Sequence, residues 1–143
     1  MLNENDFFRK KFINYYKIDM DSIEKLLHSI LDTDNIHGIL LSDYESNIRL
    51  SSTNDKKFKA DAINNNKIIS LIDKNIYKLD KNKKFEEFIT TTEDRIYISR
   101  HIKWKRDMLL YIIFDVNKTN IALATNRVKH IIIDIEKILN NVK

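Results

Sequence analysis

The chain has 143 residues, of which 43% are hydrophobic and 32% are charged, a composition that fits one globular domain and leaves no room for a second. The lack of cysteine and the single glycine exclude a disulfide framework, a thiolate nucleophile, a cysteine-ligated metal and the glycine-rich loops that hold nucleotide phosphates. The formal net charge of +4 is too small and too spread out to indicate nucleic acid as a partner.

Hydropathy gives no sign of a membrane-embedded or exported protein. No stretch approaches the roughly 18 consecutive apolar residues of a membrane span, and the start, Met1 to Asp6, is too polar and acidic for a signal peptide. We therefore expect a cytoplasmic protein.

The first predicted element is a short amphipathic helix within an N-terminal extension, residues 1–19. It follows Asp6 as a candidate cap and places aromatic side chains at helical spacing with basic residues between them: Phe7, Phe8, Phe12, Tyr15 and Tyr16 alternate with Arg9, Lys10, Lys11 and Lys17. Residues 7–17 have the pattern of a membrane-contacting helix, but packing on the protein's own domain is the favoured interpretation.

The globular domain is predicted to span residues 20–143 and to begin with a helix. Asp21 and Glu24 form a capping-box pattern, and the apolar stripe that follows predicts a helix ending near residues 32–34. Two extended runs, residues 36–42 and 47–51, then predict a β-hairpin.

Helical spacing returns between residues 53 and 76, where Phe58, Ala62, Ile69, Ile72 and Ile76 share one face. Residues 85–92, 95–104 and 108–116 predict three strands joined by short turns. A last helix, capped by Asn117 or Thr119, extends through Ile138. The sequence thus predicts an α+β fold with a five-stranded antiparallel sheet and helices on both faces, in the order α-β-β-α-β-β-β-α after the short N-terminal helix.

The residue patterns do not indicate catalysis. The spacing of the four histidines is not that of metal ligands: they are His28, His37, His101 and His130. The carboxylate pairs Glu86–Glu87 and Glu93–Asp94 are interpreted as charged side chains exposed to solvent. We therefore expect no catalytic residue, no metal and no cofactor. Lys103, Trp104, Lys105 and Arg106 form a basic cluster able to meet an acidic partner, although a solvated turn is the more frequent reason for such a cluster.

The element order and several local patterns resemble the roadblock / dynein light chain family, whose domains are related to longins and profilin. Ile36 to Asp43 is similar to the family's first strand, which contains glycine and ends in aspartate, and residues 47–52 are similar to its second strand. The strand Leu109 to Asp115 and the long helix after it match the family's ending. The resemblance covers roughly residues 20–140. The chain departs from the family at Ser46, where glycine is usual, and in its alanine-poor middle helix.

The resemblance implies a non-enzymatic, homodimeric binding module that regulates or scaffolds small Ras-like GTPases, with a heterodimer with a paralogue as the alternative assembly. The family dimerises through the middle helix and the third strand. We accordingly predict the interface residues Phe58, Ala62, Asn65, Ile69, Ile72, Phe85, Glu87 and Ile89. The predicted partner-binding residues are Lys57, Asp61, Asn64, Lys103, Trp104, Lys105 and Arg106. No arginine stands out as a finger inserted into a GTPase.

Two other classes of function stay open at this point. A ligand-sensing domain of the PAS or GAF type would share the sheet and helices but enclose a cavity. A membrane or nucleic-acid adaptor would use the basic cluster with the N-terminal helix, and the near-neutral charge balance makes it the weakest alternative.

Overall fold

The structure is a computed structural model that describes residues 20–33, 36–44, 49–51, 56–103 and 107–140. The predicted N-terminal helix and the cluster residues Trp104, Lys105 and Arg106 lie outside the described residues. The elements are α2 (Met20–Thr33), β1 (Ile36–Asp43), β2 (Arg49–Ser51), α3 (Lys56–Leu79), β3 (Glu87–Thr91), β4 (Arg95–Lys103), β5 (Asp107–Asp115) and α4 (Ile121–Asn140).

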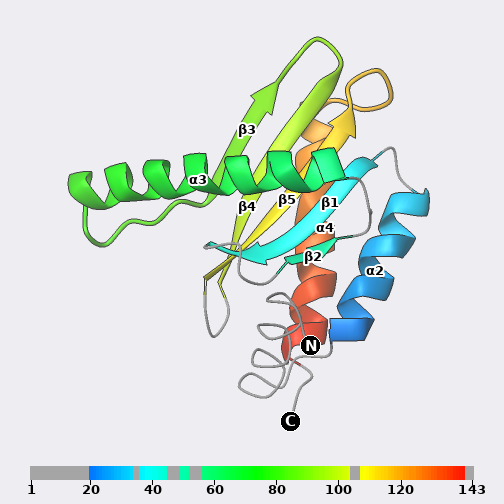
Figure 1. The fold of residues 1–143 in the computed structure, drawn as a ribbon, viewed down its shortest axis with the longest axis horizontal. Coiled ribbons are helices and arrows are strands. Elements are labelled where there is room, and N and C mark those ends of the chain that lie inside the picture. The colour runs from blue at the N-terminus through cyan, green and yellow to red at the C-terminus, as the bar shows by residue number, and fades with distance from the viewer. Residues whose placement is uncertain (1–19, 34–35, 45–48, 52–55, 104–106, 141–143) are drawn as a thin grey trace.

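The strands form one antiparallel sheet. Four strands lie in the order β1-β5-β4-β3, and the three-residue β2 pairs with β1, so the full order is β2-β1-β5-β4-β3. Helices α2 and α4 lie on one face of the sheet and α3 crosses the other (Figure 1). The predicted α+β class and the antiparallel sheet are confirmed.

The larger part of the core lies between the sheet and the helices α2 and α4. A row of isoleucines runs across four strands, because Ile89, Ile98, Ile112 and Ile39 are successive cross-strand partners. Ile98, Ile112 and Ile39 are fully buried in this core, and Ile89 packs against it. Strand β5 lies at the centre with both faces covered, which explains why Met108 to Phe114 is an unbroken apolar run.

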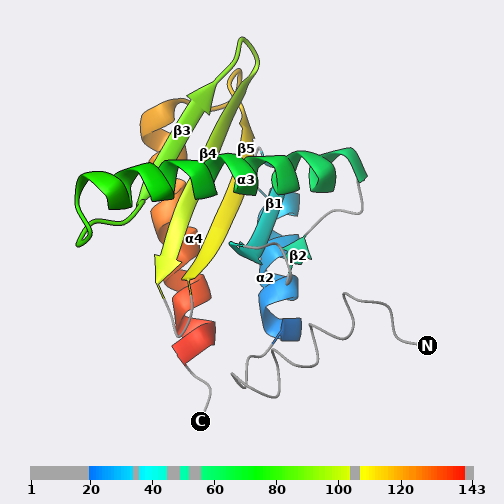
Figure 2. The same ribbon diagram turned by 60° about the vertical axis from the view of Figure 1, so that its left-hand side comes forward.

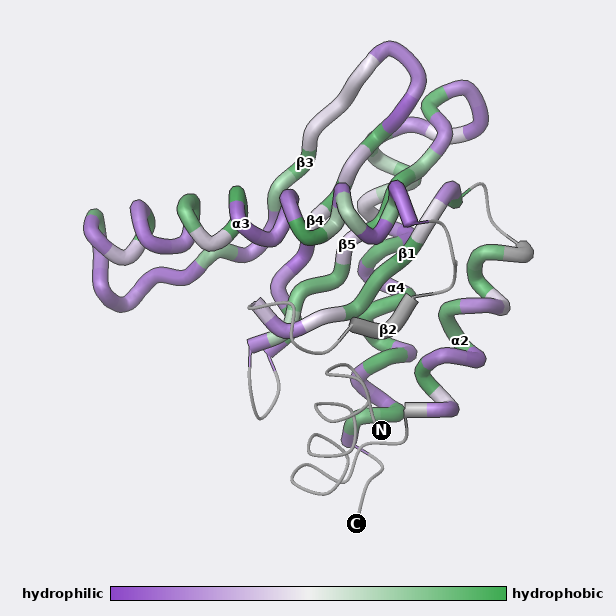
Figure 3. The backbone as a smooth tube through the Cα atoms, viewed as in Figure 1, coloured by the Kyte–Doolittle hydropathy of each residue, from purple (hydrophilic) through white to green (hydrophobic). Residues whose placement is uncertain are grey.

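Helix α3 covers the opposite face at a steep angle to the strands (Figure 2). In Figure 3 the central strands are mainly hydrophobic, whereas hydrophobic and hydrophilic turns alternate along α3. Such alternation is typical of a helix with one buried face and one solvated face. No helix in the described part of the chain has the length and apolar character that crossing a bilayer requires.

Two boundaries differ from the sequence prediction. Helix α3 continues to Leu79, three residues beyond the predicted end. Helix α4 is capped by Asn120 rather than by Asn117 or Thr119, since the Asn120 Oδ1 atom accepts a hydrogen bond from the Leu123 backbone N–H at 2.9 Å. Asp115 Oδ1 instead accepts a hydrogen bond from the Asn117 N–H within the turn before the helix.

Candidate functional site

The inner face of α3 holds three of the predicted interface residues. Phe58, Ala62 and Ile69 are buried against the protomer's own sheet, and the Phe58 ring stacks on Tyr111 with centroids 5.8 Å apart. Ile72 is half-buried in the cluster around Ile69. In the protomer these residues leave little area for a second chain.

Two asparagines attach the middle of α3 to the sheet. The Asn65 Nδ2 group donates to Ser99 Oγ of β4 at 2.8 Å, and the Asn66 Nδ2 group donates to Ser42 Oγ of β1 at 2.9 Å. Asn66, Ser42 and Ser99 are buried. Because buried polar groups are costly unless they are hydrogen-bonded, these bonds fix the position of α3 on the sheet.

The predicted interface residues around β3 also contact the protomer itself. Phe85 is buried against α3 and β5, and Ile89 packs into the core on the opposite face. Glu87 is half-buried, and one of its carboxylate oxygens lies 3.7 Å from the Arg100 guanidinium, which also pairs with Glu86 at 2.9 Å. The backbone of β3 pairs only with β4 among the strands that the structure describes. Strand β3 is therefore an edge that another strand can extend.

The solvent-facing side of α3 combines polar and apolar residues. The predicted partner-binding residues Lys57, Asp61 and Asn64 are exposed, and the spacing of Ile68 and Leu71 continues the same helical stripe. Ile68 is 51% and Leu71 61% exposed, so the free apolar surface of α3 differs from the predicted set. Lys103 is also exposed, at the end of β4.

A cluster of charged side chains joins the end of the β4–β5 hairpin to the segment before β3. The His101 Nε2 atom lies 2.8 Å from Asp107 Oδ1, and the Lys84 Nζ atom lies 3.1 Å from Asp107 Oδ2. Burial alone would raise the pKa of Asp107, but hydrogen bonds with His101 and Lys84 outweigh it and hold this pKa below its ordinary value. The Tyr44 ring meets the His101 ring edge to face at 6.0 Å. Burial, followed by the charges of Asp73 and Asp107, raises the pKa of Tyr44.

A second tyrosine connects α3 with the strand centre. Burial, with further contributions from Tyr97 and Asp61, raises the pKa of Tyr111 to about 12, and the positive charge of Arg95 opposes this change. Tyr111 therefore stays neutral over the physiological range and acts here as a packing residue beneath Phe58.

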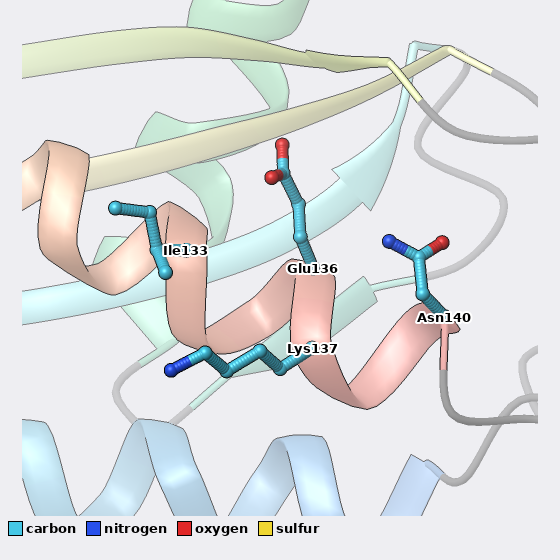
Figure 4. Close-up of a pocket in the computed structure, with 4 residues that line it drawn as sticks. All are labelled: Ile133, Glu136, Lys137 and Asn140. Carbon is cyan, nitrogen blue, oxygen red and sulfur yellow. The ribbon is translucent and has the colours of Figure 1, made fainter.

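Two cavities lie at the surface of the described regions. One, of about 690 Å³, is bordered by the β3–β4 turn and the first turn of α4. The other, of about 520 Å³, is lined by Ile133, Glu136, Lys137 and Asn140 on α4 (Figure 4). Both are surface hollows rather than enclosed chambers. Within the described residues, no group of three or more histidine, aspartate or glutamate side chains could hold a metal ion.

The described residues form an α+β domain in which β3 is the last strand of the sheet and a partly apolar face of α3 is exposed. Comparisons with solved structures show the same fold. Myxococcus xanthus MglB superposes with a TM-score of 0.68 and 16% sequence identity, over 87% of this chain and 92% of that one. MglB in a tetrameric arrangement gives a TM-score of 0.67 at 14% identity, with the same coverage. The gliding protein MglB of Thermus thermophilus gives 0.60 at 15% identity, over 81% of this chain and 89% of that one.

No protein-family model and no curated protein matches the sequence. The structural likeness confirms the predicted resemblance at the level of the fold, because MglB is a roadblock protein. This domain therefore has an MglB-like roadblock fold.

Proposed function

We propose that the chain is a non-enzymatic homodimeric binding module that regulates or scaffolds a small Ras-like GTPase. The observation that carries the proposal is the fold shared with MglB over 87% of the chain. MglB is a GTPase regulator, and one of its solved structures has a tetrameric arrangement. Residues 20–143 would form the binding domain, with residues 1–19 as its extension.

The proposed dimer pairs β3 with β3 of a second copy in the antiparallel sense. A strand at a sheet edge presents unpaired backbone groups, and pairing with an identical strand satisfies them. The two-fold axis then stands perpendicular to the joined sheet, so both α3 helices lie on the same face of it. In this arrangement the exposed apolar side chains of α3 can meet those of the second α3 helix.

The helix contact is proposed to centre on Ile68 and Leu71. Both side chains are more than half exposed in the protomer, and burying apolar surface contributes about 25 cal/mol per Å². The two-fold axis makes the two α3 helices run antiparallel to each other on this face. Lys57 lies 11 residues before Ile68, which is about 16 Å along the helix axis at 1.5 Å per residue. The GTPase surface is assigned to the polar N-terminal half of α3, with Lys57, Asp61 and Asn64, which are exposed in the protomer.

Regulation in this proposal is indirect. A binding module changes the state of a GTPase when it binds one switch conformation better than the other, and no residue has to enter the nucleotide site. Its effect is then limited by the difference between the two affinities.

The function is tested by titrating the native chain into purified small Ras-like GTPases from the same organism, loaded with GDP or with a GTP analogue. We expect at least one GTPase to bind with a difference of about fivefold or more between the two nucleotide states, the lower end of usual coupling energies.

Two matched variants locate the surface. Asn64 on α3 and Asn126 on α4 are both exposed helical asparagines. Asn64→Arg is expected to weaken binding about tenfold, and Asn126→Arg to leave it unchanged. Equal affinity for the two nucleotide states, or equal losses in the two variants, would contradict the proposal.

A further inference from the structure

Helix α4 carries a surface hollow on its last turns, on the face of the sheet opposite to α3. The residues that line this hollow of about 520 Å³ are spaced i, i+3, i+4 and i+7, so they share one side of the helix: they are Ile133, Glu136, Lys137 and Asn140 (Figure 4). Ile133 is 47% exposed there. Because the surface of a single helix is convex, this row of side chains forms one side of a binding site, and a second segment has to form the other.

The helices around the hollow are acidic and keep some apolar surface exposed. Helix α2 contacts α4 on this face of the sheet. Residues 20–33 contain three acidic residues and one lysine, a net charge of −2, and residues 131–140 contain two acidic residues and one lysine, a net charge of −1. Leu26 of α2 and Ile138 of α4 are only partly buried against the core. A segment that is both basic and apolar would complement this surface.

Residues 7–17, which lie outside the described residues, have that composition. They contain five aromatic residues, four basic residues and no acidic residue, a net charge of +4. The aromatic residues recur at helical spacing, so a helix over this segment would have one large apolar face. Such a face needs a surface to cover it, because burying apolar area is the main favourable contribution to packing.

The connection to α2 brings this segment to the hollow. The first turn of α2 and the last turn of α4 lie at the same end of the domain in both ribbon views (Figures 1 and 2). Two residues separate the segment from Met20, and consecutive helices with so short a connection are antiparallel neighbours. At 1.5 Å per residue, Phe12 then lies about 12 Å from the start of α2. Ile133 lies about 10 Å before Asn140 at the end of α4, and so at the same level.

We propose that residues 7–17 form a helix that packs on the last turns of α4 beside α2, with Phe12 over Ile133. In this position Lys17 lies near the last carbonyl groups of α4, where a positive charge is stabilising. Glu136, which is half-buried at the hollow, faces the basic side of the segment. The contact lies within one chain and on the opposite face of the sheet to α3. It therefore requires neither the dimer nor the GTPase.

Cross-linking of two introduced thiols tests the position of the segment. The native chain has no cysteine, so the full chain with Phe12→Cys and Ile133→Cys contains no other thiol. We expect a short bifunctional thiol reagent to join these two cysteines within one chain. The matched control joins Phe12→Cys with Leu123→Cys, because Leu123 is 60% exposed on the same helix but about 15 Å from Ile133. Equal yields in the two variants would overturn the proposal.

Limited digestion with trypsin tests the docking without a cross-link. The four basic residues of the segment are cleavage sites, and a docked helix is cleaved only after it detaches from the domain. Detachment is a local opening that does not require the domain to unfold, so the cleavage rate follows this opening. Ile133→Asp is expected to raise the rate about tenfold, because it removes the apolar contact, and Leu123→Asp to leave it unchanged. Equal rates in the native chain and Ile133→Asp would contradict the docking.

Two further outcomes would assign the segment to another partner. A cross-linked product of twice 17.1 kDa on a denaturing gel would mean that the segment packs on a second copy of the chain. Rapid cleavage that is slowed only by vesicles containing phosphatidylserine would mean that the segment binds an anionic bilayer. Either result would overturn docking within one chain.

Discussion

Ile112→Ala is expected to lower the free energy of unfolding by about 2–5 kcal/mol, the usual cost of truncating a buried isoleucine to alanine. Ile112 lies in the central strand β5 between its cross-strand partners Ile39 and Ile98, and all three side chains are fully buried. Both neighbouring strands and the helices behind them are fixed by other contacts. They cannot close fully over the space that the side chain leaves, so a cavity term adds to the lost burial.

Two further substitutions serve as comparisons for Ile112→Ala, with the free energy of unfolding of each variant measured by chemical denaturation. Ile112→Val removes one methyl group and should cost about 0.5–1.5 kcal/mol. Ile133→Ala on α4, where the side chain is 47% exposed, should change stability by less than about 0.5 kcal/mol. Similar losses for Ile112→Ala and Ile133→Ala would contradict the assigned core.

Gly38→Ala is expected to destabilise the protein by about 1–3 kcal/mol, the usual cost of overpacking a core. An ideal Cβ atom at position 38 would lie 2.5 Å from Cε2 and 2.6 Å from Cδ2 of the Phe58 ring, far inside van der Waals contact. The ring has little room to retreat, because it is buried and stacked on Tyr111. The single glycine of the chain is therefore needed for the close approach of α3 to β1.

A double-mutant cycle separates this contact from a general effect of alanine on the strand. Phe58→Leu removes the ring and costs stability by itself, but it also removes the clash with the new methyl group. We expect Gly38→Ala to cost at least about 1 kcal/mol less in the Phe58→Leu background than in the native chain. Additive losses, measured by urea unfolding, would show that the ring does not set the requirement for glycine.

Much of the fold could be predicted from periodicity. The stripe from Ile121 to Ile138 predicted α4, and the nearly unbroken apolar run Met108 to Val116 predicted a strand, because each pattern has one favourable way to bury its apolar groups. The helix cap was less well determined. Asn117, Thr119 and Asn120 all suit an N-cap chemically, and only the backbone geometry selects Asn120.

The surfaces were harder to predict than the elements. The sequence shows that Phe58, Ala62 and Ile69 share a face of α3, but it cannot show whether that face meets its own sheet or a partner. The structure places it on the sheet and leaves Ile68 and Leu71 exposed. The cluster of Lys84, His101 and Asp107 comes from separate elements, so no local pattern indicates it.

The solution mass of the chain tests the proposed dimer most directly. We predict that light scattering on a sizing column gives the native chain a mass of twice the 17.1 kDa of the protomer. The variant Leu71→Asp should have a mass of 17.1 kDa, because its two introduced carboxylates would meet at the helix contact and separate the protomers. Leu123 on α4 is 60% exposed, almost the same as the 61% of Leu71, so Leu123→Asp is a matched control and should keep the dimer. A monomeric native chain, or a dimer that survives Leu71→Asp, would contradict the proposed assembly.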